Sequence, residues 1–174
     1  MKAVHFGAGK IGRGFIADLL HDTGYEITFV DVNEKLNEEL NKYHNYYLYV
    51  IEEDYKRKEI DKVSALSPIT QKDDVTQAIV DADLVTTAVL ADNFPKIAAN
   101  VAAGLKTRLN AGKEKVNVIP CENALFCGDM LKAEVVKTGI ITEEEIDQIA
   151  TIPNTAVDLS LIHISEPTRR SYIS

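Results

Sequence analysis

Hydrophobic and polar positions along the chain change period several times, and each change marks a predicted element. Short apolar runs at residues 2–6, 26–31, 83–89 and 115–121 are typical of buried strands, and Pro120 should close the last of them. Ile11, Phe15 and Leu19 recur at every fourth residue, which predicts a helix over residues 11–22 that ends before Gly24.

Further helices and a pair of strands follow from the same reading. Helical spacing predicts helices over residues 33–42, 73–81, 94–110 and 124–137. Thr142 and Glu145 have the spacing of a capping box, which should open a last helix that runs to about residue 150. Residues 45–51 and 56–63 read as paired strands around a charged turn at 52–55. Strands therefore alternate with helices, which predicts an α/β fold, doubly wound, with a mostly parallel sheet and helices on both faces.

Composition narrows the possible partners. The 174 residues suggest one domain, and the net charge of −8 argues against a nucleic-acid partner or an anionic membrane. No apolar run approaches the ~18 residues that a membrane span requires, and charged residues interrupt the N-terminus by Lys10. We therefore expect a cytoplasmic protein, most simply a monomer, with Cys121 and Cys127 as reduced thiols.

A glycine motif between the first strand and the first helix carries the chemistry. Gly7, Gly9 and Gly12 form GxGxxG, and Asp31 ends the next strand. Within a strand–helix–strand unit this is the Rossmann dinucleotide-binding pattern: the first glycine permits a tight turn, the second lets a pyrophosphate approach the backbone, and the third lets the helix pack on the sheet. The free N–H groups at the helix start then face the phosphates.

Asp31 indicates which dinucleotide is bound. A carboxylate at this position accepts hydrogen bonds from the ribose hydroxyls of NAD and repels the 2′-phosphate of NADP. At ~5 Å and an effective dielectric of ~20, each unit of like charge costs on the order of 3 kcal/mol, so NAD is favoured. Two alternatives stay open: the glycines serve only a tight turn with Asp31 capping a helix, or the ligand is FAD or S-adenosylmethionine.

Residues at the ends of later strands complete the predicted site. Thr87, Ala88 and Val89 would border the nicotinamide, although Thr87 could equally fill the sheet. Glu122 and Asn123 would line the same crevice, although Asn123 could instead cap a helix. The predicted cofactor-binding residues are Ala3, Val4, His5, Phe6, Gly7, Ala8, Gly9, Lys10, Ile11, Gly12, Arg13, Gly14, Asp31, Thr87, Ala88, Val89, Glu122 and Asn123. The histidines do not cluster, His5 reads as a core residue, and no metal site is expected.

Five segments together resemble one enzyme family. They are KAVHFGAGKIGRGFI at 2–16, TFVDVN at 28–33, DLVTTAV at 83–89, CEN at 121–123 and NTAVD at 154–158. In this order they resemble the N-terminal part of the mannitol-1-phosphate 5-dehydrogenases, which are long-chain polyol dehydrogenases. The resemblance implies a metal-independent enzyme that interconverts D-mannitol 1-phosphate and D-fructose 6-phosphate with NAD. It also implies a catalytic lysine, with asparagine and histidine partners, in a helical C-terminal domain that has no match here.

The resemblance stops at residue 158. Residues 1–158 are expected to form the NAD-binding domain, and residues 159–174 depart from the family in a Ser-, Arg- and Ile-rich tail without sustained helical or strand period. We expect this tail to be unstructured or foreign to the gene, unless the chain is a genuine short variant. Without the substrate domain no catalytic residue is assigned, and the chain should be inactive alone. A stand-alone dinucleotide-binding regulatory module and another polyol or uronate dehydrogenase remain as alternative functions.

Overall fold

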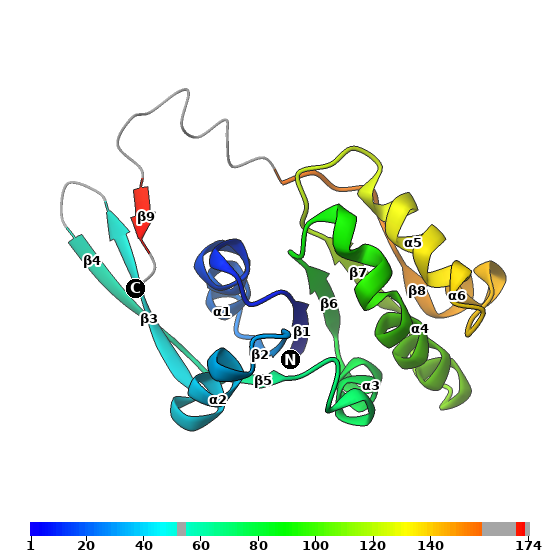
Figure 1. The fold of residues 1–174 in the computed structure, drawn as a ribbon, viewed down its shortest axis with the longest axis horizontal. Helices are drawn as coiled ribbons and strands as arrows, with labels where there is room; N and C mark the ends of the chain where they lie inside the picture. The colour runs from blue at the N-terminus through cyan, green and yellow to red at the C-terminus, as the bar shows by residue number, and fades with distance from the viewer. Residues whose placement is uncertain (52–54, 158–169, 173–174) are drawn as a thin grey trace.

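A parallel sheet of six strands organises the chain (Figure 1). The computed structural model describes residues 1–51, 55–157 and 170–172. The strand order is β5 (Val63–Leu66), β2 (Glu26–Val30), β1 (Lys2–Phe6), β6 (Leu84–Thr87), β7 (Val116–Pro120) and β8 (Ala150–Thr151). Every neighbouring pair is parallel. The predicted doubly wound α/β fold is confirmed, and its winding changes direction between β1 and β6.

Helices cover both faces of this sheet (Figure 1). One face carries the π-helical turn η1 (Gly12–Ile16), α1 (Ala17–Asp22) and α2 (Glu34–Tyr43). The other face carries α3 (Lys72–Asp81), the short 3₁₀ helix η2 (Ala91–Asn93), α4 (Phe94–Asn110), α5 (Cys127–Lys137) and α6 (Glu143–Ile149). Successive side chains of β1 point to opposite faces of the sheet, so this strand contributes to both hydrophobic cores. Ala3 packs on the first face, and Val4 and Phe6 pack on the second.

Close packing of α3 against α4 depends on a glycine and a buried arginine. A Cβ on Gly104 would lie 2.6 Å from side-chain atoms of Ile79, so only glycine allows the observed approach. One guanidinium nitrogen of Arg108 donates hydrogen bonds to the carbonyls of Ile79, Val80 and Ala82 at 2.8–3.1 Å. Arg108 therefore supplies donors to carbonyls at and just after the end of α3, of which that of Ile79 also accepts from Ala82 N at 3.4 Å.

An antiparallel hairpin is inserted between α2 and β5. Strands β3 (Asn45–Ile51) and β4 (Tyr55–Asp61) pair in register, as predicted. The second predicted strand, 56–63, is wrong at its end, because the chain turns at Lys62, whose φ is 55°. Residues 63–66 then form β5, which joins the main sheet beside β2. Most of the predicted turn, residues 52–54, lies outside the described residues.

A third strand lies on the free edge of β3. Strand β9 (Arg170–Tyr172) runs antiparallel to it, with Tyr49 opposite Tyr172 and Ile51 opposite Arg170. The expectation of a tail without regular structure is therefore wrong for these three residues, because an unpaired strand edge offers N–H and C=O groups to any extended segment. Residues 158–169 and 173–174 of the tail lie outside the described part of the chain.

The ends of two helices test the sequence reading locally. Helix α5 begins at Cys127 rather than at residue 124, because Phe126 has a left-handed backbone with φ of 57°. The capping box of α6 is confirmed: the Thr142 hydroxyl accepts from Glu145 N at 3.3 Å, and the Glu145 carboxylate accepts from Thr142 N at 3.1 Å.

Among the described residues, no helix has the length and apolar character to cross a membrane.

Candidate functional site

Two loops meet where the winding of the sheet reverses. The chain leaves β1 at Gly7 and leaves β6 at Ala88, and Ala88 N donates to Phe6 O at 2.8 Å. Gly7 has φ of 98°, and a Cβ on it would lie 2.3 Å from the Ala88 carbonyl oxygen. Only glycine fits both the backbone angle and the contact, so the glycine loop after β1 packs directly on the end of β6.

Gly12 is closed in by its neighbours. A Cβ there would lie 2.0 Å from the Gly7 carbonyl oxygen and 2.7 Å from Nε2 of His5. His5 is fully buried, as predicted for a core residue, with Nδ1 2.6 Å from the Thr86 hydroxyl. Burial lowers the pKa of His5 to about 3, so the ring is neutral at physiological pH. The tight fit brings the first turn of the helix onto the sheet.

Gly9 is the open position of the motif. No atom lies within 4 Å of where its Cβ would stand, and Gly9, Lys10 and Ile11 are exposed. The guanidinium of Arg13 folds back and donates to the carbonyl of Ala8, on the same loop. Of the three glycines, therefore, two are required by internal packing, and the third leaves room beside the backbone for something outside the chain.

Asp31 joins the glycine loop to the end of β2. Its carboxylate accepts from Ala8 N at 2.6 Å and from Asn33 N at 2.9 Å. The alternative role of helix cap belongs to Asn33, whose side chain accepts from Leu36 N at 3.2 Å. Asp31 is half-buried, and each of its carboxylate oxygens has a second lone pair. It is able to accept further hydrogen bonds from a ligand while it holds the loop.

Thr87 and Glu122 contact each other in the interior. Both are buried, and the Thr87 hydroxyl donates to the Glu122 carboxylate at 3.0 Å. The same carboxylate accepts from Val89 N at 2.9 Å and Leu90 N at 3.0 Å. The sequence reading placed Glu122 along the crevice but missed Leu90, which has φ of 69°. Its only sequence signal was its place directly after Val89.

The other predicted site residues lie in strand β1, in the turn η1 and in the segment between β7 and α5. Ala3, Val4 and Phe6 are buried in β1, where their side chains pack in the two cores. Gly14 lies in the π-helical turn η1, which the spacing of apolar residues did not reveal. Asn123 is exposed in the segment between β7 and α5.

Within the described ranges, the cysteines and the acidic residues are candidates for a second reactive centre. Cys121 and Cys127 are free thiols, and burial raises the pKa of Cys121 to about 11, so it remains protonated. No cluster of three or more His, Cys, Asp or Glu side chains suited to a metal ion occurs in the part of the chain that the structure describes.

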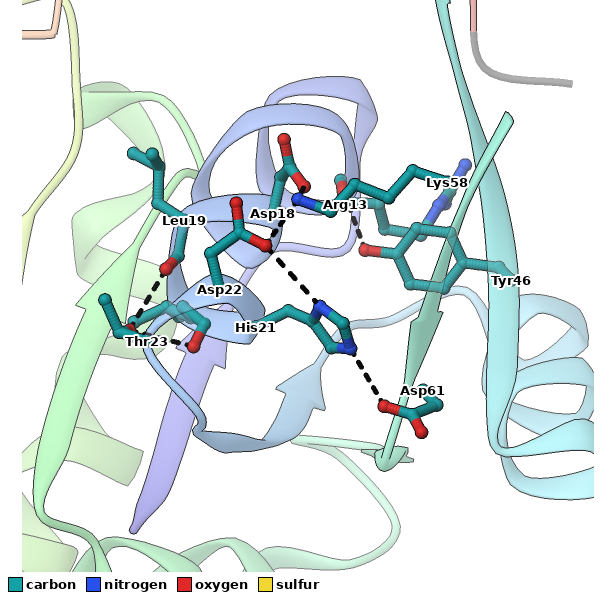
Figure 2. Close-up of polar contacts among 10 residues, drawn as sticks. Arg13, Asp18, Leu19, His21, Asp22, Thr23, Tyr46, Lys58 and Asp61 are labelled. Carbon is teal, nitrogen blue, oxygen red and sulfur yellow. Dashed lines mark hydrogen bonds and ion pairs between the residues drawn. The ribbon is translucent and has the colours of Figure 1, made fainter. Parts of the chain in front are cut away.

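The hairpin is fixed to the helix that follows the glycine loop (Figure 2). Lys58 Nζ on β4 lies 2.6 Å from carboxylate oxygens of both Asp18 and Asp22 on α1. His21 Nε2 lies 2.8 Å from Asp61, and Tyr46 donates its hydroxyl hydrogen to the carbonyl of Arg13 at 2.6 Å. Burial raises the pKa of Tyr46, which keeps its hydroxyl a donor at physiological pH. The glycine-loop helix is thus held from the sheet and from the hairpin.

A parallel sheet with this strand order, an open glycine at its switch point and an acid at the end of β2 define the Rossmann class of nucleotide-binding domains. The family follows from sequence: the family model described as "Mannitol dehydrogenase Rossmann domain" matches residues 1–162. The chain therefore belongs to the mannitol dehydrogenase family.

Two curated relatives from different bacteria carry the same name. The chain is 41% identical over 159 residues to mannitol-1-phosphate 5-dehydrogenase of Thermoanaerobacter pseudethanolicus, covering 91% of this chain and 41% of that protein. It is 44% identical over 161 residues to the enzyme of the same name from Shouchella clausii, covering 91% of this chain and 42% of that protein. The chain thus spans less than half the length of these relatives.

A solved structure has the same fold. Mannitol 2-dehydrogenase of Pseudomonas fluorescens, in a ternary complex with NAD and D-mannitol, superposes with a TM-score of 0.76 at 15% identity. The superposition covers 98% of this chain and 48% of that one. At this identity the likeness supports the Rossmann fold alone.

Proposed function

We propose that this chain is the NAD-binding part of a mannitol-1-phosphate 5-dehydrogenase, the enzyme that interconverts D-mannitol 1-phosphate and D-fructose 6-phosphate. The observation that carries the proposal is the contrast within the glycine loop, where Gly7 and Gly12 are enclosed and Gly9 faces open space. A dinucleotide pyrophosphate needs such an open backbone position at the start of a helix. The names of the relatives supply mannitol 1-phosphate as the substrate, and fructose 6-phosphate is the second member of the pair that the family resemblance implies.

The residues present fit the adenosine and pyrophosphate parts of NAD. The loop at Gly9 would receive the pyrophosphate, with free N–H groups of the following turn as donors. Asp31 would accept hydrogen bonds from the ribose hydroxyls and, through its charge, disfavour the 2′-phosphate of NADP. When bound, NAD supplies the nicotinamide ring that accepts a hydride from the alcohol carbon.

The chain itself orients the cofactor and leaves proton transfer to groups elsewhere. We assign no catalytic residue within residues 1–158, and we expect the base and the sugar-phosphate contacts in the portion that the relatives have beyond this match. The 174-residue chain alone should not reduce fructose 6-phosphate. Loss of general acid–base help costs ~10² to 10⁴ in rate, before substrate positioning is counted.

Titration of purified chain with NADH and NADPH tests the cofactor part of the proposal. We expect the wild type to bind NADH at least roughly tenfold more tightly, since one unit of charge repulsion costs on the order of 3 kcal/mol before screening. Gly9→Val should abolish binding of both, because side-chain atoms would fill the space at the loop. Asp31→Asn, which keeps one acceptor for the loop but removes the charge, should narrow the preference.

Two controls separate these effects from misfolding. Ala99→Val, at an exposed position of α4, should bind like the wild type, and every variant should melt near the wild-type temperature. Equal affinity of the wild type for NADH and NADPH would contradict the role of Asp31. Unchanged binding in Gly9→Val would show that the loop is not the pyrophosphate site.

A further inference from the structure

We propose that Glu122 is a positioning residue: its buried carboxylate fixes residues 88–90 as the nicotinamide-side wall of the cofactor site without touching the cofactor. The inference rests on the proposed binding of NAD. Glu122 is 4% exposed and lies directly after β7. Strand β7 is the neighbour of β6 in the sheet, and Glu122 contacts the segment that follows β6. Its carboxylate is turned to the neighbouring strand end, where it accepts three hydrogen bonds.

The backbone after β6 is held on both sides. Glu122 accepts from the N–H groups of Val89 and Leu90 at 2.9 and 3.0 Å. Asn93, in η2, donates from its side-chain amide to Val89 O at 2.6 Å and from its backbone N–H to Leu90 O at 2.9 Å. All four polar backbone groups of these two residues therefore have partners, which is uncommon for a surface loop and defines one conformation.

Leu90 shows that this conformation is imposed. Its φ of 69° and ψ of 135° lie in a region that non-glycine residues rarely adopt, and such residues persist only where their surroundings over-determine them. Its side chain is 70% exposed, so packing of the leucine contributes little. The hydrogen bonds to Glu122 and Asn93 are the interactions that hold the strained backbone.

The fixed segment stands beside the glycine loop. A Cβ on Gly7 would lie 2.3 Å from Ala88 O and 3.0 Å from a side-chain methyl of Val89, so the two loops touch at the switch point. Asp31 holds the opposite side of the glycine loop, at the end of β2. A dinucleotide across this edge has its adenosine on the Asp31 side and its other half along residues 88–90. Glu122 should therefore act on one half of the ligand only.

This asymmetry gives a test with two ligands on the 174-residue chain. ADP-ribose contains every part of NAD except the nicotinamide ring, so the comparison isolates the contact with that ring. In Glu122→Gln, an amide N–H replaces one acceptor and faces backbone donors, so one hydrogen bond to the loop is lost. We expect the NADH dissociation constant to rise roughly tenfold, as for loss of a hydrogen bond to a charged group. The ADP-ribose constant should stay within about twofold of wild type, because this ligand lacks the ring, and its adenosine and pyrophosphate contact the glycine loop and Asp31.

A second variant tests whether the backbone angle is the link. Glycine adopts positive φ without strain, so Leu90→Gly in the Glu122→Gln background should recover part of the NADH affinity. Glu38→Gln, which removes an exposed carboxylate on α2, is the matched control and should change neither constant.

The outcomes separate the two proposals. Selective loss of NADH affinity with recovery by glycine supports the positioning role. Equal loss for both ligands, or no loss, overturns it while leaving NAD binding intact. A wild-type chain that binds neither ligand contradicts the proposed function and this inference with it.

Discussion

Alanine substitution at two glycines of one loop should have opposite consequences. At Gly12 the new methyl group would stand 2.0 Å from the Gly7 carbonyl oxygen and 2.7 Å from His5 Nε2, whereas ordinary contact begins at 3.4 Å. The nearest atom is backbone, and the ring of His5 is buried, so neither neighbour moves easily. Overpacking of this kind costs ~1–3 kcal/mol, and we expect the upper end, about 3 kcal/mol.

At Gly9 the same methyl group meets no atom within 4 Å. Glycine-to-alanine changes at compatible backbone angles stabilise by about 0.4–1 kcal/mol, because the unfolded chain loses freedom. For a chain of this size 1 kcal/mol corresponds to roughly 2–4 °C in Tm. Gly12→Ala should therefore melt roughly 6–12 °C below wild type, and Gly9→Ala should melt at or slightly above it.

Calorimetric melting, together with NADH titration of each variant, measures both effects. Gly9→Ala should keep its stability and lose NADH affinity, since the methyl group stands where the pyrophosphate approaches. Gly12→Ala should lose stability first. A Gly12→Ala protein that melts within about 2 °C of wild type would refute the packing argument, because even 1 kcal/mol should shift Tm by that much.

Two further predictions concern buried charge. Because His5 has a pKa of about 3 when folded and 6.5 as a free side chain, its contribution to stability is complete above pH 6.5 and is lost as pH falls towards 3, by up to about 1.4 kcal/mol per pH unit. Urea unfolding at pH 7 and pH 4.5 should therefore show a narrower stability gap between wild type and His5→Asn at the acid pH, and parallel losses would contradict this. Arg108→Met should lower the unfolding free energy by about 2–3 kcal/mol, because it removes the guanidinium donors to the carbonyls of Val80 and Ala82. Urea unfolding at pH 7 measures the loss, and an unchanged midpoint would mean that water replaces the guanidinium.

Local sequence patterns were sufficient for most of the sheet and helices. Helix α4 begins and ends where its apolar spacing predicts, and the capping box at Thr142 forms both of its hydrogen bonds. The glycine spacing correctly located a strand–turn–helix unit, because each of its constraints acts within a few residues.

The misses arose where distant residues decide a backbone angle or a pairing. Nothing in the local sequence distinguishes Lys62, whose positive φ divides β4 from β5. Strand β8 is two residues long and exists because β7 offers it an edge. The role of Glu122 depends on a neighbouring strand end more than thirty residues away along the chain. Spacing identified Glu122 as belonging to this edge of the sheet, but it could not reveal that its carboxylate faces the protein interior.

Glu122 also contacts a third segment of the chain through its backbone. Its carbonyl oxygen accepts from Val157 N at 2.9 Å, while its side chain holds Val89 and Leu90. Glu122 therefore joins the segment at residue 157 to the backbone that follows β6, so the position of each segment constrains the other.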